Sequence, residues 1–356
     1  MIYEFLYNLI GSHIVASFIS AVFPLAFLVP FALFAVYLER KVSGHMQDRL
    51  GPMRVGWHGW LQTVADIIKL VQKEDITASA TDKKLFNFAP VLVFAGSYAA
   101  FAAIPFTSIY IGSNIDLGIL YIVAVSSFVV AGILMAGWAS NNKYSLLGAM
   151  RSAAQIVSYE IPTVLVILSI IVISGTLNLM TLSEQQSSSF YNWMIFGGAV
   201  AGWKKFVLIP FVMIGFLVIY ISSLAEVNRT PFDIPEAESE LVSGYHTEYS
   251  GMKFAMFFLA EYANMFAVSA VVVALFLGGY QSPFGYLGNT TGLTWLIPVE
   301  QFFWFAAKGI FFVFVQMWLR WTLPRLRVDQ LMVVCWKYLI PISFANLVII
   351  ALIMVL

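Results

Sequence analysis

Acidic side chains crowd one segment in the second half of the chain. Seven acids lie between positions 226 and 261, with only Arg229 and Lys253 as basic residues. Such carboxylates repel one another unless they pair or share protons, and shared protons are what a proton relay uses. Asp233 and Glu236 have the spacing of a helix capping box, which would account for two of them. We therefore expect a proton relay or a partner-binding surface, centred on an acidic coupling loop at residues 225–250. The seven acids are Glu226, Asp233, Glu236, Glu238, Glu240, Glu248 and Glu261.

Three ionisable residues interrupt long apolar runs: Glu160, Glu261 and Lys308. Tyr159 and Tyr262 adjoin the two glutamates. A charge in the hydrocarbon layer of a membrane costs a few kcal/mol or more, so such residues usually face a bundle interior or a water path and mark proton or ion routes. The alternative is a buried structural ion pair, for which Lys308 is one candidate partner, although buried pairs add little stability compared with apolar packing.

A third charged group follows the first apolar run and opens a segment at residues 39–85. It contains Glu39, Arg40, Lys41, Arg49 and Arg54. Guanidinium and ammonium groups donate hydrogen bonds to a polar head group, and an apolar helix beside them can flank a long tail. This arrangement suits the entrance to a site for an amphiphile. The alternative interpretation is a set of topological anchors attracted to anionic lipid.

The hydrophobic pattern predicts the elements that position these residues. Of the 356 residues, 60% are hydrophobic and only 11% are charged, whereas soluble domains carry about 25% charged residues. Apolar runs near the roughly 20 residues needed to cross a bilayer occur eight times. They lie at about 14–38, 86–110, 116–138, 144–175, 204–224, 252–278, 299–322 and 331–355. We expect an all-α integral membrane protein with a single polytopic domain over residues 1–356. A short apolar stretch at 190–203 is broken by glycines and is expected to be interfacial, although a ninth span stays open.

One further helix is expected on the membrane surface. Between the first two apolar runs, apolar residues recur at spacings of three and four, which predicts an amphipathic helix over residues 57–72. They are Trp57, Trp60, Leu61, Val64, Ile67, Ile68 and Val71. Of the 19 basic residues, 16 fall in connections on the same side of the membrane as this helix. The positive-inside rule places that side in the cytoplasm or matrix, and both termini on the opposite side.

The sequence offers no means of holding a redox cofactor on this chain. Cys335 is the single cysteine, which excludes a disulfide framework, a thiolate iron–sulfur cluster and a Cys-rich zinc site. A glycine-rich dinucleotide fingerprint, a phosphate loop and an HExxH zinc motif are all missing from the sequence. Any redox centre that works with this protein must therefore lie on another chain.

Four stretches together resemble one known family. These are Glu39-Arg40-Lys41 to Gly51-Pro52, Ala225 to Leu241, Ala260-Glu261-Tyr262, and Arg325 to Met332. They are similar to the signatures of the quinone-site membrane subunit of respiratory complex I, the NADH-quinone oxidoreductase of bacteria and mitochondria. The matches span nearly the whole chain in order, which makes them specific. Two departures are Met53, where Asn often follows Gly-Pro, and Val328, where Tyr is common.

The resemblance implies a subunit that joins the redox arm of the complex to the membrane arm, lines the chamber for ubiquinone or menaquinone, and couples quinone reduction to proton translocation. FMN and iron–sulfur clusters would lie on partner subunits, and the expected location is a bacterial plasma membrane, with the mitochondrial inner membrane less favoured. The implied quinone-site residues are Glu39, Arg40, Lys41, Arg49, Arg54, Trp60, Arg229 and Phe232. The implied proton route contains Glu160, Glu226, Asp233, Glu236, Glu238, Glu240, Glu248, Glu261 and Tyr262.

Two other functions keep some of these features. A related subunit of a membrane-bound hydrogenase or formate hydrogenlyase would share the fold and the acids without necessarily binding quinone, but the segment from Glu39 to Gly56 favours the quinone enzyme. A free-standing secondary transporter would explain the buried acids. It does not explain a dense acidic loop on the cytoplasmic side.

Overall fold

The computed structural model describes residues 3, 7, 10–187, 190–200, 202–235, 238–288 and 292–356, and in these ranges the regular elements are all helical. Eight helices in the described part of the chain are long and apolar enough to cross a membrane, which confirms the predicted fold class. They are α2 (His13–Met46), α4 (Lys83–Ala99), α5 (Gly118–Ala139), α6 (Lys143–Ser174), α8 (Trp203–Glu226), α10 (Gly251–Phe276), α12 (Leu296–Thr322) and the final span Val328–Val355.

The final span is assembled from three pieces in the same direction. A short helix α13 (Val328–Val333) leads into a π-helical turn (Val334–Leu339) and then into α14 (Ile340–Val355). Tyr159 and Cys335 join this span to α6: the Tyr159 hydroxyl donates to the carbonyl of Leu331 at 2.9 Å, and Cys335 Sγ donates to the carbonyl of Ser158 at 3.1 Å. The π turn therefore lies beside the part of α6 that carries Glu160.

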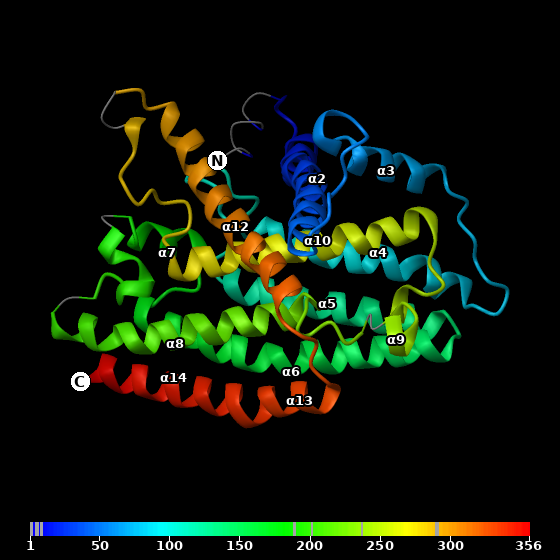
Figure 1. Ribbon diagram of the computed structural model, residues 1–356. Helices are drawn as coiled ribbons and strands as arrows, with labels where there is room; N and C mark the ends of the chain where they lie inside the picture. The colour runs from blue at the N-terminus through cyan, green and yellow to red at the C-terminus, as the bar shows by residue number, and fades with distance from the viewer. Residues whose placement is uncertain are drawn as a thin grey trace.

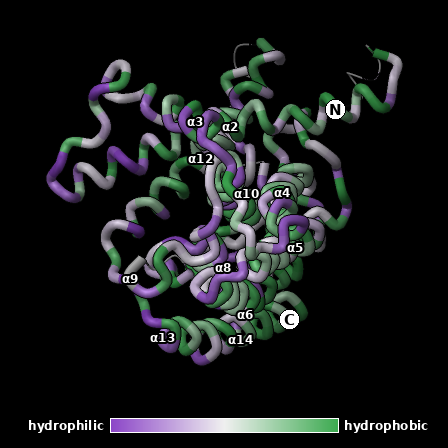
Figure 2. Tube along the Cα trace, turned by 90° about the vertical axis from the view of Figure 1, so that its right-hand side faces the viewer, coloured by the Kyte–Doolittle hydropathy of each residue, from purple (hydrophilic) through white to green (hydrophobic). Residues whose placement is uncertain are grey.

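The spans pack as a bundle with α6 and α10 in its interior (Figure 1). Helix α6 contacts α5, α8 and α14, and α10 contacts α4, α8, α12 and α2. One apolar core lies among α6, α8 and the final span, and a second, rich in phenylalanine, lies among α2, α10 and α12. Figure 2 shows hydrophobic residues along the helices and hydrophilic residues gathered in several of the connections. Burial of apolar surface therefore fixes the positions from which the charged residues project.

Helix α2 is longer than the sequence predicts. The apolar run ends near position 38, but the helix continues to Met46, so that Glu39, Arg40 and Lys41 belong to its last turns. Glu, Arg and Lys are strong helix formers, and nothing before Gly44 breaks the backbone pattern. The chain then turns through Asp48, at φ 51°. This extension points Glu39 toward the helix bundle.

The connections contain shorter elements. The expected surface helix begins later than predicted: a single 3-10 turn at Trp57–Gly59 contains His58 at φ 53°, and the α-helix α3 covers only Gln62–Gln72. The acidic loop contains α9 (Glu238–Leu241) and the 3-10 turn Gly244–His246. The stretch after α7 (Leu179–Gln185) holds two 3-10 turns, Phe190–Asn192 and Met194–Phe196, and is not among the eight candidate spans.

Candidate functional site

Five side chains from four parts of the chain meet in a buried charge cluster. Glu39 comes from α2, Arg229 from the turn after α8, Glu261 and Tyr262 from α10, and Arg320 from α12. The Glu39 carboxylate accepts hydrogen bonds from Arg229 Nη1 at 3.1 Å, from the Tyr262 hydroxyl at 2.6 Å and from Arg320 Nη1. Arg229 Nη2 lies 3.0 Å from Glu261 Oε1. Residues far apart in the sequence thus form one contact network.

The buried charge cluster is electrically balanced. It holds two carboxylates and two guanidinium groups, and the Arg229 side chain is only 3% exposed, against 9% for Glu39 and 17% for Glu261. A guanidinium group presents donors in a rigid plane, which lets Arg229 bridge both carboxylates. The Arg229 guanidinium carbon also lies 5.0 Å from the centre of the Tyr262 ring, within cation–π range. Because buried charges depend on their partners, a change in charge at one member disturbs the others.

The residues expected at the quinone entrance lie around the end of α2 and around α3. Arg40 Nη1 forms a 2.5 Å ion pair with Asp66 of α3, whose other oxygen lies 3.9 Å from Lys69. Lys41 Nζ lies 3.0 Å from Met53 Sδ, and Arg49 Nε donates to Gln47 Oε1 at 2.7 Å. Asp66 was not expected at the site. Its place on the polar face of the predicted helix was the signal for it.

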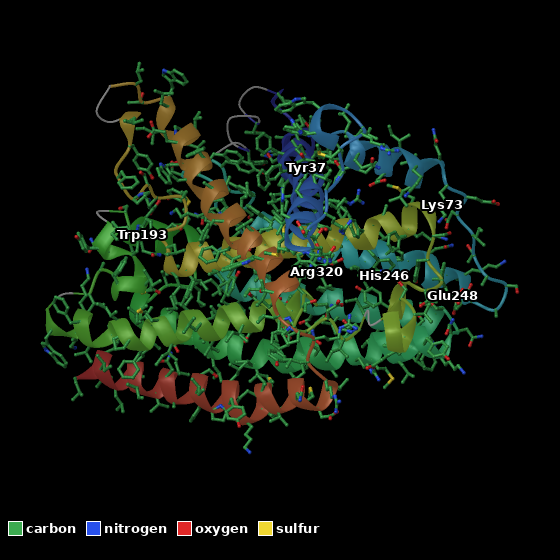
Figure 3. The ribbon with its side chains drawn as sticks, viewed as in Figure 1. Tyr37, Lys73, Trp193, His246, Glu248 and Arg320 are labelled. Carbon is green, nitrogen blue, oxygen red and sulfur yellow. The ribbon has the colours of Figure 1, made fainter. Side chains whose placement is uncertain are left out.

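The outer face of α3 is apolar and exposed. Trp60 is 56% exposed and stacks with the Tyr37 ring of α2, with ring centroids 6.4 Å apart. Arg54 is also exposed. The exposed apolar residues that continue this face are Leu61, Val64, Ile67, Ile68 and Val71. A polar inner face with such an outer face is the pattern of helices that lie along a membrane interface, as expected from the sequence. Figure 3 shows Tyr37 and Lys73 on this part of the molecule.

Phe232, expected at the quinone site, is buried and not exposed to a ligand. Its side chain is buried in the apolar core, with its ring centroid 5.2 Å from that of Tyr159. Its carbonyl accepts a hydrogen bond from Gln155 Nε2 at 2.8 Å. This position leaves Phe232 little surface of its own for a quinone and makes it an anchor for the acidic loop.

Three acids of the loop, Asp233, Glu240 and Glu248, each have a separate partner. Asp233 pairs with Arg325 at 3.0 Å, Glu240 pairs with Arg151 of α6 at 2.6 Å, and Glu248 accepts from Asn142 at 2.7 Å. Glu236 lies outside the described residues, so the capping box expected with Asp233 does too, and Glu238 begins α9. Figure 3 shows Glu248 and His246 at the same end of the molecule as α3. Pairing therefore offsets part of the repulsion that the sequence implies.

Tyr249 closes the acidic loop at its far end. Its ring stacks on Phe86, with centroids 4.1 Å apart, and its hydroxyl donates to the Phe86 carbonyl at 3.3 Å. Burial raises the pKa of the Tyr249 hydroxyl above its ordinary value, which keeps the group neutral. The loop is thus fixed to α4 by an apolar contact.

Two membrane glutamates flank a small internal cavity. Its volume is about 60 Å³, and Glu226 lines it at the end of α8. Glu160 lies one hydrogen bond away, since its Oε1 accepts from the lining residue Ser126 at 2.9 Å. The other polar lining residues are Thr163, Ser223 and Asn264. A cavity with polar partners and more than about 15 Å³ can hold water. Sequence reasoning missed these four small polar residues, whose only signal was their position inside apolar runs.

Metal binding finds no support in the described part of the chain, where no group of three or more His, Cys, Asp or Glu side chains comes together. Lys308 is not paired with Glu160 or Glu261 in the described ion pairs, but the buried ion pair considered from the sequence does occur for Glu261. Glu261 pairs with Arg229 instead. The chemistry that this arrangement can perform is proton and charge transfer between side chains.

Comparison with known proteins gives a consistent result. The family model for NADH dehydrogenase matches residues 19–351. The H subunit of NADH-quinone oxidoreductase from Chlorobaculum tepidum is 52% identical over 342 residues, covering 94% of this chain and 91% of the relative. The corresponding protein of Chlorobium luteolum is 51% identical over 346 residues, covering 95% and 89%. That of Brevibacillus brevis is 46% identical over 333 residues, covering 94% and 91%.

Proposed function

Because the chain belongs to the NADH dehydrogenase family and is a membrane subunit of NADH-quinone oxidoreductase, respiratory complex I, we propose that it lines the quinone chamber and couples quinone reduction to proton translocation. The observation that carries this proposal is the buried charge cluster. Through Arg229 it connects Glu39, at the end of α2 beside the proposed entrance, to Glu261 in the membrane-spanning helix α10. A change of charge at the quinone would act on Glu39 and pass through Arg229 to Glu261.

The proposed entrance is the segment 39–85 with helix α3. An exposed apolar helix face supports binding of a long tail, and the basic residues beside it support binding of a polar head, which together suit ubiquinone or menaquinone. In this proposal Arg40, held by Asp66, faces the head group from the end of α2. The proposed quinone-site residues are Glu39, Arg40, Lys41, Arg49, Arg54, Trp60, Arg229 and Phe232, of which Phe232 supports the site from within the core.

The proposed proton route begins at the buried charge cluster and leads to the cavity between α5, α6, α8 and α10. The end of α8 and the turn after it link the two, because the helix ends at Glu226 and the turn carries Arg229. The members of the route are Glu160, Glu226, Asp233, Glu236, Glu238, Glu240, Glu248, Glu261 and Tyr262. Buried carboxyl groups with exchangeable partners can change protonation when a neighbouring charge changes, which suits them to a coupled switch.

The remaining parts of the enzyme are assigned to partner chains. We propose that FMN and the iron–sulfur clusters lie on peripheral-arm subunits, and that neighbouring small membrane subunits continue the proton route. A bacterial plasma membrane is the proposed location, supported by relatives that come from bacteria. The hydrogenase-type subunit and the free-standing transporter are not favoured, because these relatives are subunits of NADH-quinone oxidoreductase.

Replacement of Glu160 or Glu261 by Gln tests the proposed function. The amide keeps the shape of the side chain but cannot titrate, so the complex should assemble while proton translocation and quinone turnover fall by at least tenfold. NADH oxidation by ferricyanide should stay unchanged. The double substitution should cost less than the two single losses combined, because members of one relay are not independent.

Glu184→Gln is the matched control, since Glu184 lies in α7, outside the proposed route. It should leave both activities intact. Gln variants that assemble normally and pump at the native proton-to-electron ratio and rate would show that Glu160 and Glu261 are structural.

A further inference from the structure

A lysine in the membrane-spanning helix α12 is bound by backbone carbonyls at the end of α10. Lys308 Nζ donates three hydrogen bonds, to the carbonyl oxygens of Leu277 at 2.7 Å, Gly279 at 2.8 Å and Gln281 at 2.8 Å. An ammonium group has three N–H donors, so all of them are used. We call the turn at residues 277–281 the carbonyl cradle.

Packing against neighbouring side chains shapes the carbonyl cradle. Gly278 and Gly279 have φ angles of 74° and 53°, a left-handed region that favours glycine. A Cβ atom on Gly278 would lie 2.5 Å from Nε1 of Trp193, and one on Gly279 would lie 2.3 Å from Oγ of Ser183. The Trp193 ring also covers the ammonium group, with its centroid 4.5 Å from Nζ. The turn is therefore held in place by residues other than Lys308.

The carbonyl cradle favours a cation. Lys308 takes part in none of the ion pairs among the described residues. Its charge is therefore stabilised by the carbonyl dipoles of the cradle and by the Trp193 ring. The C-terminal end of a helix carries the negative end of the helix dipole and favours a positive group. A neutral apolar side chain at this position would leave three carbonyls without this donor in a buried part of the protein, where Tyr280 is 1% and Gln281 6% exposed, and an unpaired buried carbonyl costs free energy.

The same two helices carry the buried charge cluster farther along their length. Helix α10 supplies Glu261 and Tyr262, and α12 supplies Arg320. At a rise of 1.5 Å per residue, Glu261 lies about 22 Å from the end of α10, and Arg320 lies about 18 Å from Lys308. Helices α10 and α12 pack against each other between these points. Helices α10 and α12 are thus connected at two positions along their length, by the carbonyl cradle and by the buried charge cluster.

We propose that Lys308 is a positioning residue: its ammonium group, held in the carbonyl cradle, fixes the position of α10 along its axis relative to α12. This position keeps Glu261 and Tyr262 of α10 in contact with Glu39 and Arg229. A slide of α10 by one residue, about 1.5 Å along its axis, would break the 2.6 Å hydrogen bond from Tyr262 to Glu39. This inference rests on the proposed role of the buried charge cluster in coupling.

Two substitutions of Lys308 in the detergent-purified complex test the proposal. Lys308→Ala leaves a hole beside the carbonyl cradle, and its quinone turnover should fall at least tenfold while the ferricyanide activity stays unchanged. Methylammonium or ethylammonium should restore turnover severalfold, because a free ammonium group can enter the hole and bind the carbonyls. Lys308→Met fills the space with a neutral chain, so it should lose turnover to the same degree and should not respond to the amine.

Gln316→Ala is the matched control. It removes another hydrogen bond between the two helices, from Gln316 Nε2 to Ser269 Oγ at 3.1 Å, without removing a charge. Its turnover should not respond to the amine.

Four results would overturn the proposal. They are native turnover in Lys308→Met, no amine response in assembled Lys308→Ala, an equal amine response in Gln316→Ala, and failure of both Lys308 variants to assemble. The last result counts against the proposal because the other contacts of α10 should preserve the fold. The proposed function fails separately: it falls if Glu261→Gln is silent, whereas the amine response reports on the carbonyl cradle alone.

Discussion

Replacement of Arg229 should strongly destabilise the protein. A second substitution, at Glu261, should reverse part of that destabilisation. Arg229→Met removes the guanidinium group that bridges Glu39 at 3.1 Å and Glu261 at 3.0 Å, in a place where its own side chain is 3% exposed. Removing one partner of a buried ion pair costs about 3–5 kcal/mol, because it leaves an uncompensated charge. At about 1.4 kcal/mol per factor of ten, the cost corresponds to roughly a 10²- to 10⁴-fold change in an equilibrium constant.

The assay is the rate at which the protein dissociates from the purified complex at a fixed elevated temperature, followed by native electrophoresis. Arg229→Met should accelerate dissociation by about 10²-fold or more, in line with the cost of an unpaired buried charge. Arg229→Met combined with Glu261→Gln should dissociate more slowly than Arg229→Met alone, because the second change removes the carboxylate that lost its ion pair. Stabilisation of the complex by the second substitution would show that the first had left an unbalanced charge.

Arg151→Met provides the control for this experiment. It breaks the ion pair with Glu240, whose side chain is 60% exposed, and exposed pairs contribute only about 0–1 kcal/mol. Dissociation of Arg229→Met at the rate of this control would refute the reasoning. So would a double variant that dissociates faster than Arg229→Met.

Two further predictions concern the topology and the quinone entrance. Cysteines introduced at Tyr3 and Arg325 should react with a membrane-impermeant thiol reagent from opposite sides of the membrane, because 16 of the 19 basic residues fall on the side of Arg325. Labelling of both cysteines from the same side would contradict this topology. Arg49→Ala should raise the apparent KM for quinone severalfold and leave ferricyanide reduction by NADH intact. Lys143→Ala, which changes an exposed basic residue outside segment 39–85, is the control and should change neither. Unchanged quinone kinetics in fully assembled Arg49→Ala would remove Arg49 from the entrance.

The helices of this protein were predictable because the membrane imposes a simple rule. A span needs about 20 apolar residues, and the sequence contains eight such runs, each of which became a helix. The ends of the helices were harder. Helix α2 continues to Met46 because Glu39, Arg40 and Lys41 are compatible with a helix although they are charged. Hydropathy reports which residues lie in lipid, whereas a helix can extend beyond the lipid.

Contacts between distant charges were not predictable from one sequence. Glu39 and Arg229 are 190 positions apart, and nothing local to either residue indicates the other. The sequence placed Glu39 with a quinone entrance and Glu261 with a proton route as separate groups. Their contact depends on how α2, α10 and α12 pack, which is decided by the shapes of phenylalanine-rich surfaces. Ser126 was missed for a similar reason, since a single serine in an apolar span carries no periodic signal.

A single turn of chain connects the buried charge cluster to the internal cavity. Glu226, which lines the cavity, ends α8, and Arg229 follows three residues later. Gln155 of α6 holds this turn, since its Nε2 donates to the carbonyl of Ala225 at 2.8 Å and to Oδ1 of Asn228 at 3.1 Å.

Because Gln155 and Glu160 lie on the same helix, a movement of Arg229 would act on both membrane glutamates at once. Glu226 would move with the end of α8, and Glu160 would respond through α6. In the proposed mechanism the coupling element is the turn at 225–229, which a change of charge among Glu39, Arg229 and Glu261 would displace. A signal would then pass from the proposed entrance to the cavity without a continuous row of titratable groups between them.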